Sequence, residues 1–175
     1  EDGNDFLFGE AGADILYGGA GVDAVVYSAS TAAVTVNLTT KVGSGGDAQG
    51  DAYAGIENLT GSNYNDVLTG DTLANDLRGG SGNDKLLGGA GNDSLYGGAG
   101  NDSLYGEDGN DSLYGEAGAD TMSGGSGVDA VVYSASTAAV IVNLTTKVGS
   151  GGDAQGDAYA SIENLTGSKY DDVLT

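Results

Sequence analysis

The residues of this sequence that could do chemistry are aspartates that recur every nine positions. Each of them stands two residues before an apolar side chain, as Asp84 does before Leu86. Paired carboxylates can act as a general acid and base, or they can bind a divalent cation. The aspartates in this register are Asp5, Asp14, Asp23, Asp66, Asp84, Asp93, Asp102, Asp111, Asp120, Asp129 and Asp172.

The composition excludes most of the alternative chemistry. The 175 residues include no His and no Cys, which excludes Ser-His-Asp triads, thiolate nucleophiles, zinc fingers and disulfides. We expect no enzyme, because the carboxylate pairs repeat identically along the chain and leave no unique cleft. A formal charge of −21 disfavours nucleic acid and anionic membranes as partners. No apolar run approaches the ~20 residues that span a bilayer, so we expect no membrane insertion.

Charge and hydropathy alone leave two classes open. A weakly apolar, strongly acidic chain is typical of disorder, or of a fold that recruits cations to cancel its charge. The apolar residues favour the second class, because they recur every nine positions together with the aspartates. A fixed period with one apolar residue per unit indicates a solenoid, in which several units must stack before a core closes.

The chain is periodic at a longer scale as well. Residues 1–69 recur as residues 107–175, which gives a long repeat of 106 residues. Nonapeptides fill residues 1–27 and 61–133, a further block begins at 167–175, and inserts fill 28–60 and 134–166. Because about thirty residues cannot bury much core alone, we expect the inserts to be wider coils of one continuous solenoid. The start of the sequence carries no basic, apolar leader, so we expect a mature fragment or another export route.

The nonapeptide itself indicates how the aspartates are positioned. Its first six residues, GGxGxD, predict a loop, since glycine permits φ > 0 and close backbone approach. Its last three predict a short strand with a buried central residue. Two nonapeptides then form one flattened coil of 18 residues, and coils stack in parallel at ~4.8 Å. The predicted fold class is therefore all-β, a parallel β-roll. In the inserts, residues 34–38 predict a strand with one buried face.

Stacking would place the aspartates in two rows of like charge, which opposes folding unless a cation lies between the coils. Calcium accepts six to eight oxygen ligands at ~2.3–2.6 Å, including backbone carbonyls, in flexible geometry. Magnesium requires a tighter octahedron, and transition metals favour the imidazole and thiolate ligands that this chain lacks. We therefore expect several Ca²⁺ ions per chain, held by aspartates 18 residues apart together with loop carbonyls.

The nonapeptide GGAGNDSLY, at residues 88–96 and 97–105, resembles the GGxGxDxUx repeat of the RTX (hemolysin-type) calcium-binding family. This resemblance implies a right-handed β-roll filled with Ca²⁺ and secretion by the bacterial type I route, with folding outside the cell. It also implies that the Asp at position six ligates by its side chain and positions one to four by carbonyls. The corresponding residues are Gly80, Gly82, Gly88, Gly89, Ala90, Gly91, Gly97, Gly98, Ala99, Gly100, Gly106, Asp108, Gly109, Gly115, Ala117 and Gly118.

Several positions depart from the pattern. Asn75 replaces the usual Asp and Leu73 a glycine, so we expect the weakest calcium binding around residues 70–75. Glutamate replaces the second glycine at residues 10, 107 and 116. Asp51 and Asp157 fall near the register within the inserts and are secondary metal candidates together with Asn75. For both aspartates, as for residues 47 and 153, the sequence favours a surface loop over a metal ligand.

Three functions are compatible with these features. The leading hypothesis is a calcium-dependent structural module of a secreted or cell-surface protein, with Ca²⁺ as its partner. The alternative is a subunit that assembles end to end into an extracellular filament, surface layer or matrix, since both ends finish in repeat register without a polar cap. An ice- or glycan-binding face is less favoured, because the outward asparagines at position five lack threonine neighbours. Tyr96 and Tyr114 are expected to pair on the outer face of the roll.

Overall fold

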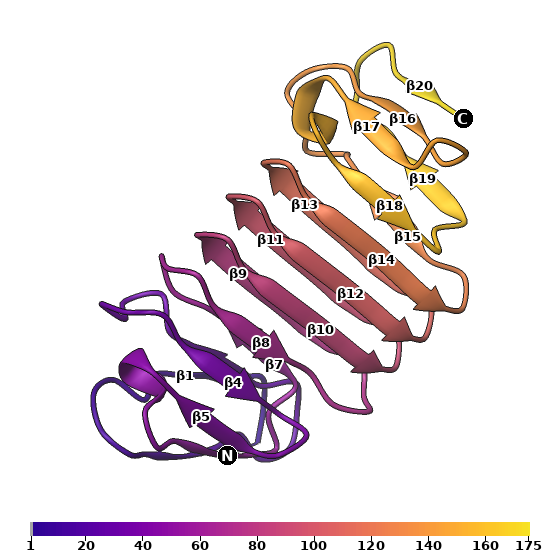
Figure 1. Cartoon of the computed structure of the whole chain (residues 1–175). Coiled ribbons are helices and arrows are strands. Elements are labelled where there is room, and N and C mark those ends of the chain that lie inside the picture. The colour runs from indigo at the N-terminus through magenta and orange to yellow at the C-terminus, as the bar shows by residue number, and fades with distance from the viewer. Residues whose placement is uncertain (1) are drawn as a thin grey trace.

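The computed structural model describes residues 2–175, and they form a nearly all-β solenoid of two sheets (Figure 1). The chain winds back and forth between the sheets, so that strands consecutive in sequence alternate between them in the central part. The N- and C-termini lie at opposite ends of the stack. The predicted all-β roll is therefore confirmed.

The first sheet has eight strands, and all its strand pairs are parallel. In spatial order they are β1 (Phe6–Leu7), β3 (Ala24–Val26), β7 (Asn58–Thr60), β9 (Asp76–Ser81), β11 (Ser94–Ala99), β13 (Ser112–Ala117), β15 (Ala130–Val132) and β19 (Asn164–Thr166).

The second sheet has twelve strands. In spatial order they are β2 (Ile15–Tyr17), β6 (Ala52–Ala54), β5 (Val42–Ser44), β4 (Thr35–Asn37), β8 (Val67–Thr69), β10 (Lys85–Ala90), β12 (Ser103–Asp108), β14 (Thr121–Ser126), β18 (Ala158–Ala160), β17 (Val148–Ser150), β16 (Ile141–Asn143) and β20 (Val173–Leu174). Two short 3₁₀ helices, η1 (Gly46–Ala48) and η2 (Gly152–Ala154), complete the inserts. Within residues 2–175, no helix is long and apolar enough to cross a membrane.

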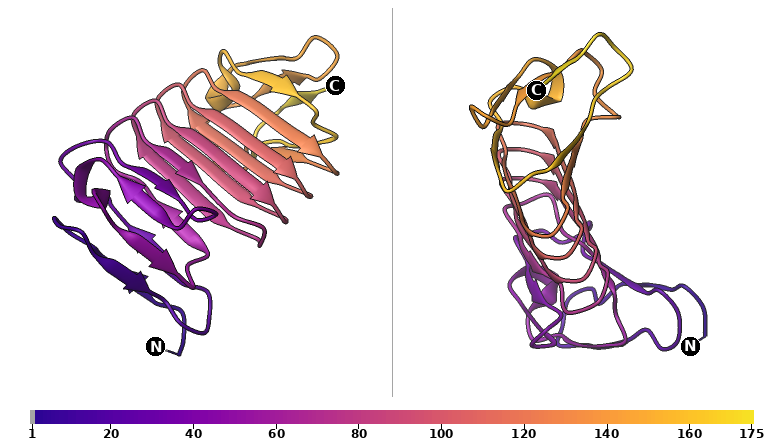
Figure 2. Two further views of the ribbon diagram at one scale, coloured as in Figure 1. Left: turned by 60° about the horizontal axis from the view of Figure 1, so that its bottom comes forward. Right: turned by 90° about the vertical axis from the view of Figure 1, so that its right-hand side faces the viewer.

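The register of the central strands confirms a coil of 18 residues. In the second sheet Leu86 pairs with Leu104, and in the first sheet Leu95 pairs with Leu113. Figure 2 shows the resulting stack of similar coils from two sides. Residues 18 apart in sequence therefore become neighbours in adjacent coils throughout residues 67–126.

The core is a double column of aliphatic side chains, one from each nonapeptide. Because side chains alternate along a strand, the apolar residue at position eight points into the space between the sheets. Each sheet contributes one uninterrupted column of these side chains. The residues in the central columns are almost fully buried: Leu59, Leu68, Leu77, Leu86, Leu95, Leu104, Leu113, Met122 and Val131. On the outside, Tyr96 and Tyr114 stack with ring centroids 4.3 Å apart, as expected, and the Arg78 guanidinium lies 4.5 Å from the Tyr96 centroid.

The central strands are longer than the sequence indicates. Strands β9 to β14 each span six residues, so positions one to three of the next nonapeptide belong to the strand and not to the loop. The expectation that all of GGxGxD is loop was wrong for these positions. Glycine at position two explains the difference: Gly98 adopts φ +106° and still pairs in register with Glu116. Without a Cβ, the chain can bend there while it stays in the ladder.

Each insert adds antiparallel pairing to the otherwise parallel second sheet. Strand β5 pairs antiparallel with both β4 and β6, and β17 does the same with β16 and β18. The predicted strand at residues 34–38 is confirmed as β4: Val34, Val36 and Leu38 are buried, whereas Thr35 is exposed. Both inserts therefore extend the second sheet by an antiparallel meander.

Neighbouring leucines of β10 test the importance of the core column. Leu86 is fully buried, whereas Leu87 is only half-buried on the outer face. We expect Leu86→Ala to lower the free energy of unfolding by about 2–5 kcal/mol, since it removes a buried side chain and leaves a cavity. Leu87→Ala is the matched control and should cost far less. Urea denaturation in saturating calcium measures both, and equal losses would contradict the assigned orientation.

Candidate metal sites

The structure brings the position-six aspartates together in two rows, linked by a ladder of side-chain hydrogen bonds. The backbone N–H of Asp84 donates to Oδ1 of Asp102 at 2.8 Å, and the N–H of Asp93 donates to Oδ1 of Asp111 at 2.9 Å. The same bond recurs from coil to coil, including the N–H of Asp5 to Oδ1 of Asp23. Each carboxylate in the ladder thus uses one oxygen to tie its loop to the preceding coil.

The second carboxylate oxygen is left without a donor at eight of these positions. In each case Oδ2 is buried and has no hydrogen-bond partner. A buried carboxylate oxygen without a donor or cation is strongly unfavourable. The eight residues are Asp14, Asp23, Asp84, Asp93, Asp102, Asp111, Asp120 and Asp129.

Burial of these carboxylates opposes their ionisation. It raises the pKa of Asp84 and of Asp120 to about 7, and the pKa of Asp93 to about 6, and neighbouring carboxylates add to the effect. Burial also raises the pKa of Asp102 and of Asp111. Burial thus makes the ionised rows unfavourable near neutral pH, and a bound cation would offset this cost.

The glycine at position one keeps open the space beside the orphaned oxygen of every one of these aspartates except Asp14. A Cβ on Gly97 would lie 2.4 Å from Oδ2 of Asp102 and 2.8 Å from the carbonyl oxygen of Gly115 in the next coil. Gly88 stands in the same relation to Asp93 and to the Gly106 carbonyl. A carboxylate and a backbone carbonyl thus converge on one small space. Such an all-oxygen environment fits a hard cation such as Ca²⁺.

Side chains alone do not form these sites. Among residues 2–175, no group of three or more Asp and Glu side chains lies close enough to hold a metal ion. The remaining ligands would have to be backbone carbonyls of positions one to four. The glutamates at position two do not disrupt this arrangement: Glu107 and Glu116 adopt positive φ, 78° and 67°, with exposed side chains.

Asp51 and Asp157 are not surface residues, and that expectation was wrong. Each is only 1% exposed and continues the aspartate ladder, with Oδ1 accepting the N–H of Asp14 or of Asp120. Their Oδ2 atoms accept hydrogen bonds from Tyr27 and Tyr133. These two tyrosines were not predicted as site residues. The signal for them in the sequence is that they recur 106 residues apart, each 24 residues before one of these aspartates.

Three further candidate metal ligands, Asp66, Asp172 and Asn75, differ from the eight orphaned aspartates because their side chains have hydrogen-bond partners. Oδ2 of Asp66 accepts hydrogen bonds from the backbone N–H and the hydroxyl of Ser62. Oδ1 of Asp172 accepts the Val140 N–H and the Ser168 hydroxyl, and these donors lower the pKa of Asp172. Asn75 accepts the Asp71 N–H and donates its amide to the Glu57 carbonyl. At these positions the protein itself satisfies the side chain. Asp5 is only partly buried and is not among the orphaned carboxylates.

The position-five asparagines stabilise the stack from outside. Oδ1 of Asn83 accepts the backbone N–H of Asn101, and Oδ1 of Asn92 accepts that of Asn110. These oxygens are already used within the roll. The arrangement therefore gives no support to an ice-binding face.

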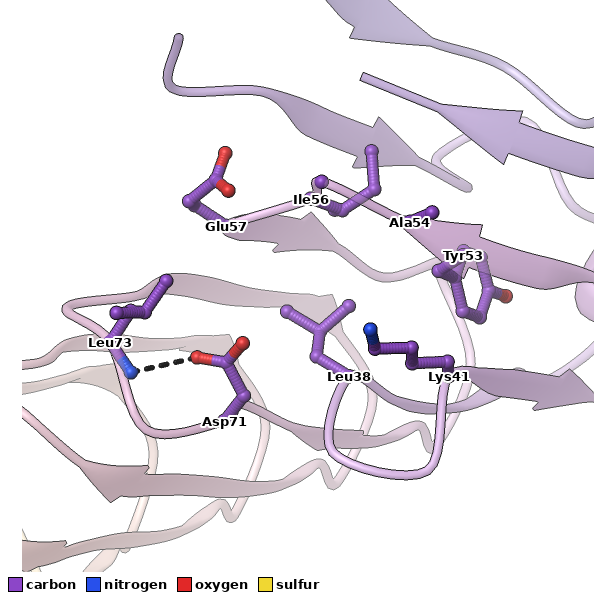
Figure 3. Close-up of a pocket in the computed structure, with 9 residues that line it drawn as sticks. Leu38, Lys41, Tyr53, Ala54, Ile56, Glu57, Asp71 and Leu73 are labelled. Carbon is purple, nitrogen blue, oxygen red and sulfur yellow. Dashed lines mark hydrogen bonds between the residues drawn. The ribbon is translucent and has the colours of Figure 1, made fainter. Parts of the chain in front are cut away.

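A small pocket lies beside each insert. The first has a volume of about 190 Å³ and is lined by Lys41, Glu57, Asp71 and apolar residues around Tyr53 (Figure 3). Its dashed hydrogen bond joins the Leu73 N–H to Asp71. The second insert forms an equivalent pocket with Lys147, Tyr159 and Glu163. Since the pocket recurs with the insert, it belongs to the repeat and is not a unique cleft.

Stacked coils, periodic loop glycines and buried carboxylate rows define a cation-binding solenoid repeat protein. Four copies of the RTX calcium-binding nonapeptide repeat match residues 1–27, 51–72, 69–104 and 96–131, which is more than half of the chain. The chain belongs to this family. No curated protein shows significant similarity to it. The repeat identifies a Ca²⁺-binding structural module and not a catalytic one.

The raised carboxyl pKa values predict how the calcium-free chain responds to acid. Asp ionises near pH 3.9 when unfolded, whereas burial raises the pKa of Asp84 and Asp120 to about 7 in the roll. The folded state thus binds more protons. These carboxyl groups therefore contribute fully to the stability of the folded state below about pH 4, and that contribution is lost as the pH rises through 6–7.

We therefore expect the β signal in circular dichroism to increase when calcium-depleted protein is acidified from pH 7.5 to 5. The control is the same titration in saturating calcium, where the roll should already be folded at pH 7.5. A β signal that stays flat or falls on acidification of the calcium-depleted protein would contradict the expectation.

Proposed function

We propose that the chain is a calcium-dependent structural module of a secreted or cell-surface bacterial protein, which folds when it meets extracellular calcium. The observation that carries this proposal is the set of eight buried Asp Oδ2 atoms without a donor. They lie in two rows, and in the central coils a glycine carbonyl converges with the carboxylate on the same space, as at Asp84, Asp93, Asp102 and Asp111. The fold thus creates anionic sites that its own donors do not satisfy.

The residues that would hold calcium are these eight aspartates and the loop carbonyls around them. In the central part, Asp102 would ligate through Oδ2, and the position-one carbonyl of Gly115 would face the same ion. The carbonyls of positions two to four, for example Gly98, Ala99 and Gly100, would complete the ligand set. The bound ion neutralises the row of carboxylates and joins adjacent coils, so its role is structural.

Coupled folding and binding follows from the charge. At the low calcium concentration of a cytosol, repulsion among 26 acidic residues against 5 basic ones and the entropy of 34 glycines favour the open chain. Extracellular modules bind calcium with dissociation constants of about 10⁻⁴–10⁻³ M, which suits folding after export. RTX repeat proteins are typically secreted by bacteria, and this supports an extracellular location for the parent protein.

A matched pair of aspartates tests calcium binding. Calcium should convert a coil-like circular dichroism spectrum of the wild-type chain to a β spectrum, and chelator should reverse the change. Asp102→Asn should raise the calcium midpoint about tenfold or more, because losing a charged ligand costs at least ~1.4 kcal/mol. Asp108→Asn removes the same charge from an exposed side chain and keeps the backbone carbonyl, which is the only candidate ligand of this residue, so it should have little effect. A wild-type spectrum that calcium does not change would refute the proposal.

A second candidate function is self-association through the ends of the solenoid. Strands β1 and β2 are the terminal strands of the two sheets, and they expose Phe6 (73%) and Ile15 (84%). At the other end β20 exposes Val173 (51%). Unpaired strand edges with apolar side chains favour edge-to-edge pairing, here between the two ends of successive copies.

Sedimentation velocity tests this assembly. In saturating calcium the wild-type chain should form species larger than a monomer as its concentration rises. Ile15→Lys places a charge on the exposed edge and should suppress them. A wild-type chain that remains monomeric at millimolar concentration would contradict end-to-end assembly.

A further inference from the structure

A buried cluster of two tyrosines and one aspartate lies at the first insert, which supplies Asp51 and Tyr53, while Tyr27 directly precedes it. The Tyr27 hydroxyl donates to Oδ2 of Asp51 at 2.6 Å, and the Tyr53 hydroxyl lies 2.6 Å from that of Tyr27. All three side chains are at most 4% exposed. Oδ1 of Asp51 accepts the N–H of Asp14, so this carboxylate is also a member of the aspartate ladder.

The same cluster recurs at the second insert, 106 residues later. Tyr133 donates to Oδ2 of Asp157 and lies in hydrogen-bond contact with Tyr159. Oδ1 of Asp157 accepts the N–H of Asp120 at 2.9 Å. The arrangement therefore belongs to the long repeat.

Asp51 and Asp157 differ from the six orphaned aspartates between the two inserts in the partner of their Oδ2 atom. They occupy the same ladder with the same Oδ1 bond, but their Oδ2 atom has a donor. The donor comes from an uncharged hydroxyl, and burial raises the pKa of Tyr27 and of Tyr133, so both keep their protons. These carboxylates are satisfied without a cation.

The inserts also provide the space that the second tyrosine needs. Gly43 in β5 lies against Tyr53, and a Cβ there would stand 2.1 Å from the tyrosine oxygen. Gly149 in β17 lies against Tyr159 in the same way, at 2.2 Å. The antiparallel strand that each insert adds is thus fitted around the hydroxyl pair.

We propose that the hydroxyls of Tyr27 and Tyr133 take the place of a calcium ion at Asp51 and Asp157, which makes each insert a metal-free boundary between calcium-binding blocks. This inference rests on the proposed calcium binding of the other aspartates. It assigns the tyrosines as the residues that determine where the row of ions stops. The block between the two boundaries contains six orphaned carboxylates: Asp84, Asp93, Asp102, Asp111, Asp120 and Asp129.

Asn75 shows that the ladder accepts an uncharged side chain where the protein supplies the partner. Its Oδ1 accepts the Asp71 N–H, and its amide donates to the Glu57 carbonyl at 2.7 Å. An asparagine at position 157 could likewise find hydrogen-bond partners for both its oxygen and its amide. Its Oδ1 could keep the Asp120 N–H, and its amide could donate to the Tyr133 oxygen, whose proton would turn to Tyr159.

The decisive experiment compares Asp157→Asn with Asp102→Asn in the full chain. Bound calcium per chain is measured by equilibrium dialysis in excess Ca²⁺. Asp157→Asn should leave the number of bound ions unchanged, and Asp51→Asn, at the equivalent boundary, should agree with it. Asp102→Asn should lower the number by at least one. A loss of ions in Asp157→Asn equal to that in Asp102→Asn would overturn the inference. If the wild-type chain binds no calcium, the proposed function fails instead.

A hydroxyl deletion tests the donor itself. Tyr133→Phe keeps the ring and leaves Oδ2 of Asp157 without a partner, so the melting temperature in saturating calcium should fall by several degrees. Tyr105→Phe, on the half-buried outer face, is the control and should leave it unchanged. The number of bound ions should stay the same in Tyr133→Phe, or rise by one if calcium enters the vacated place. An unchanged melting temperature or a lower number of ions would count against the proposal.

Discussion

The structure depends on one electrostatic constraint: carboxylate oxygens are buried in rows where the protein offers them no proton donor. In the central coils, Oδ1 of each position-six aspartate accepts the backbone N–H of the residue 18 positions earlier in the preceding coil, which fixes the spacing of the coils. The same bond holds Oδ2 inside the loop, where water is excluded. The stacking that closes the leucine core thus also brings the carboxylates together, and under the proposed function folding and cation binding are one process.

The glycines serve this constraint in two physically distinct ways. At positions two and four the backbone has a positive φ, which glycine adopts most easily, as at Gly100 with φ +139°. At position one the conformation is ordinary, and glycine is required because a Cβ would occupy the space shared by an aspartate oxygen and a carbonyl of the next coil. Glutamate is consequently tolerated at position two, where φ can become positive at a modest cost, whereas the nonapeptides of the central block keep glycine at position one.

Features with a nine-residue period could be predicted from the sequence. The buried leucines, the 18-residue coil and the stacked pair of Tyr96 and Tyr114 follow from counting and strand alternation. The length of the strands could not, because a glycine with positive φ is usual in a loop and here continues the ladder. The burial of Asp51 was missed because its partner Tyr27 lies 24 residues away, across an insert that has no short period. Contacts of that kind are set by tertiary packing.

The inserts therefore interrupt the rows of carboxylates without donors, although their sequence has no short period that would indicate this. A continuous row of orphaned carboxylates would make every coil depend on the occupancy of its neighbours, since each ion would be shared between coils. A tyrosine hydroxyl breaks this dependence, because it satisfies the carboxylate with a donor whose presence does not vary with calcium concentration. Serine does the same at Asp66, on the far side of the first insert from Asp51. Among the described residues, the solenoid thus alternates between coils whose carboxylates have protein donors and coils whose carboxylates have an oxygen without one, and the 106-residue repeat is the period of that alternation.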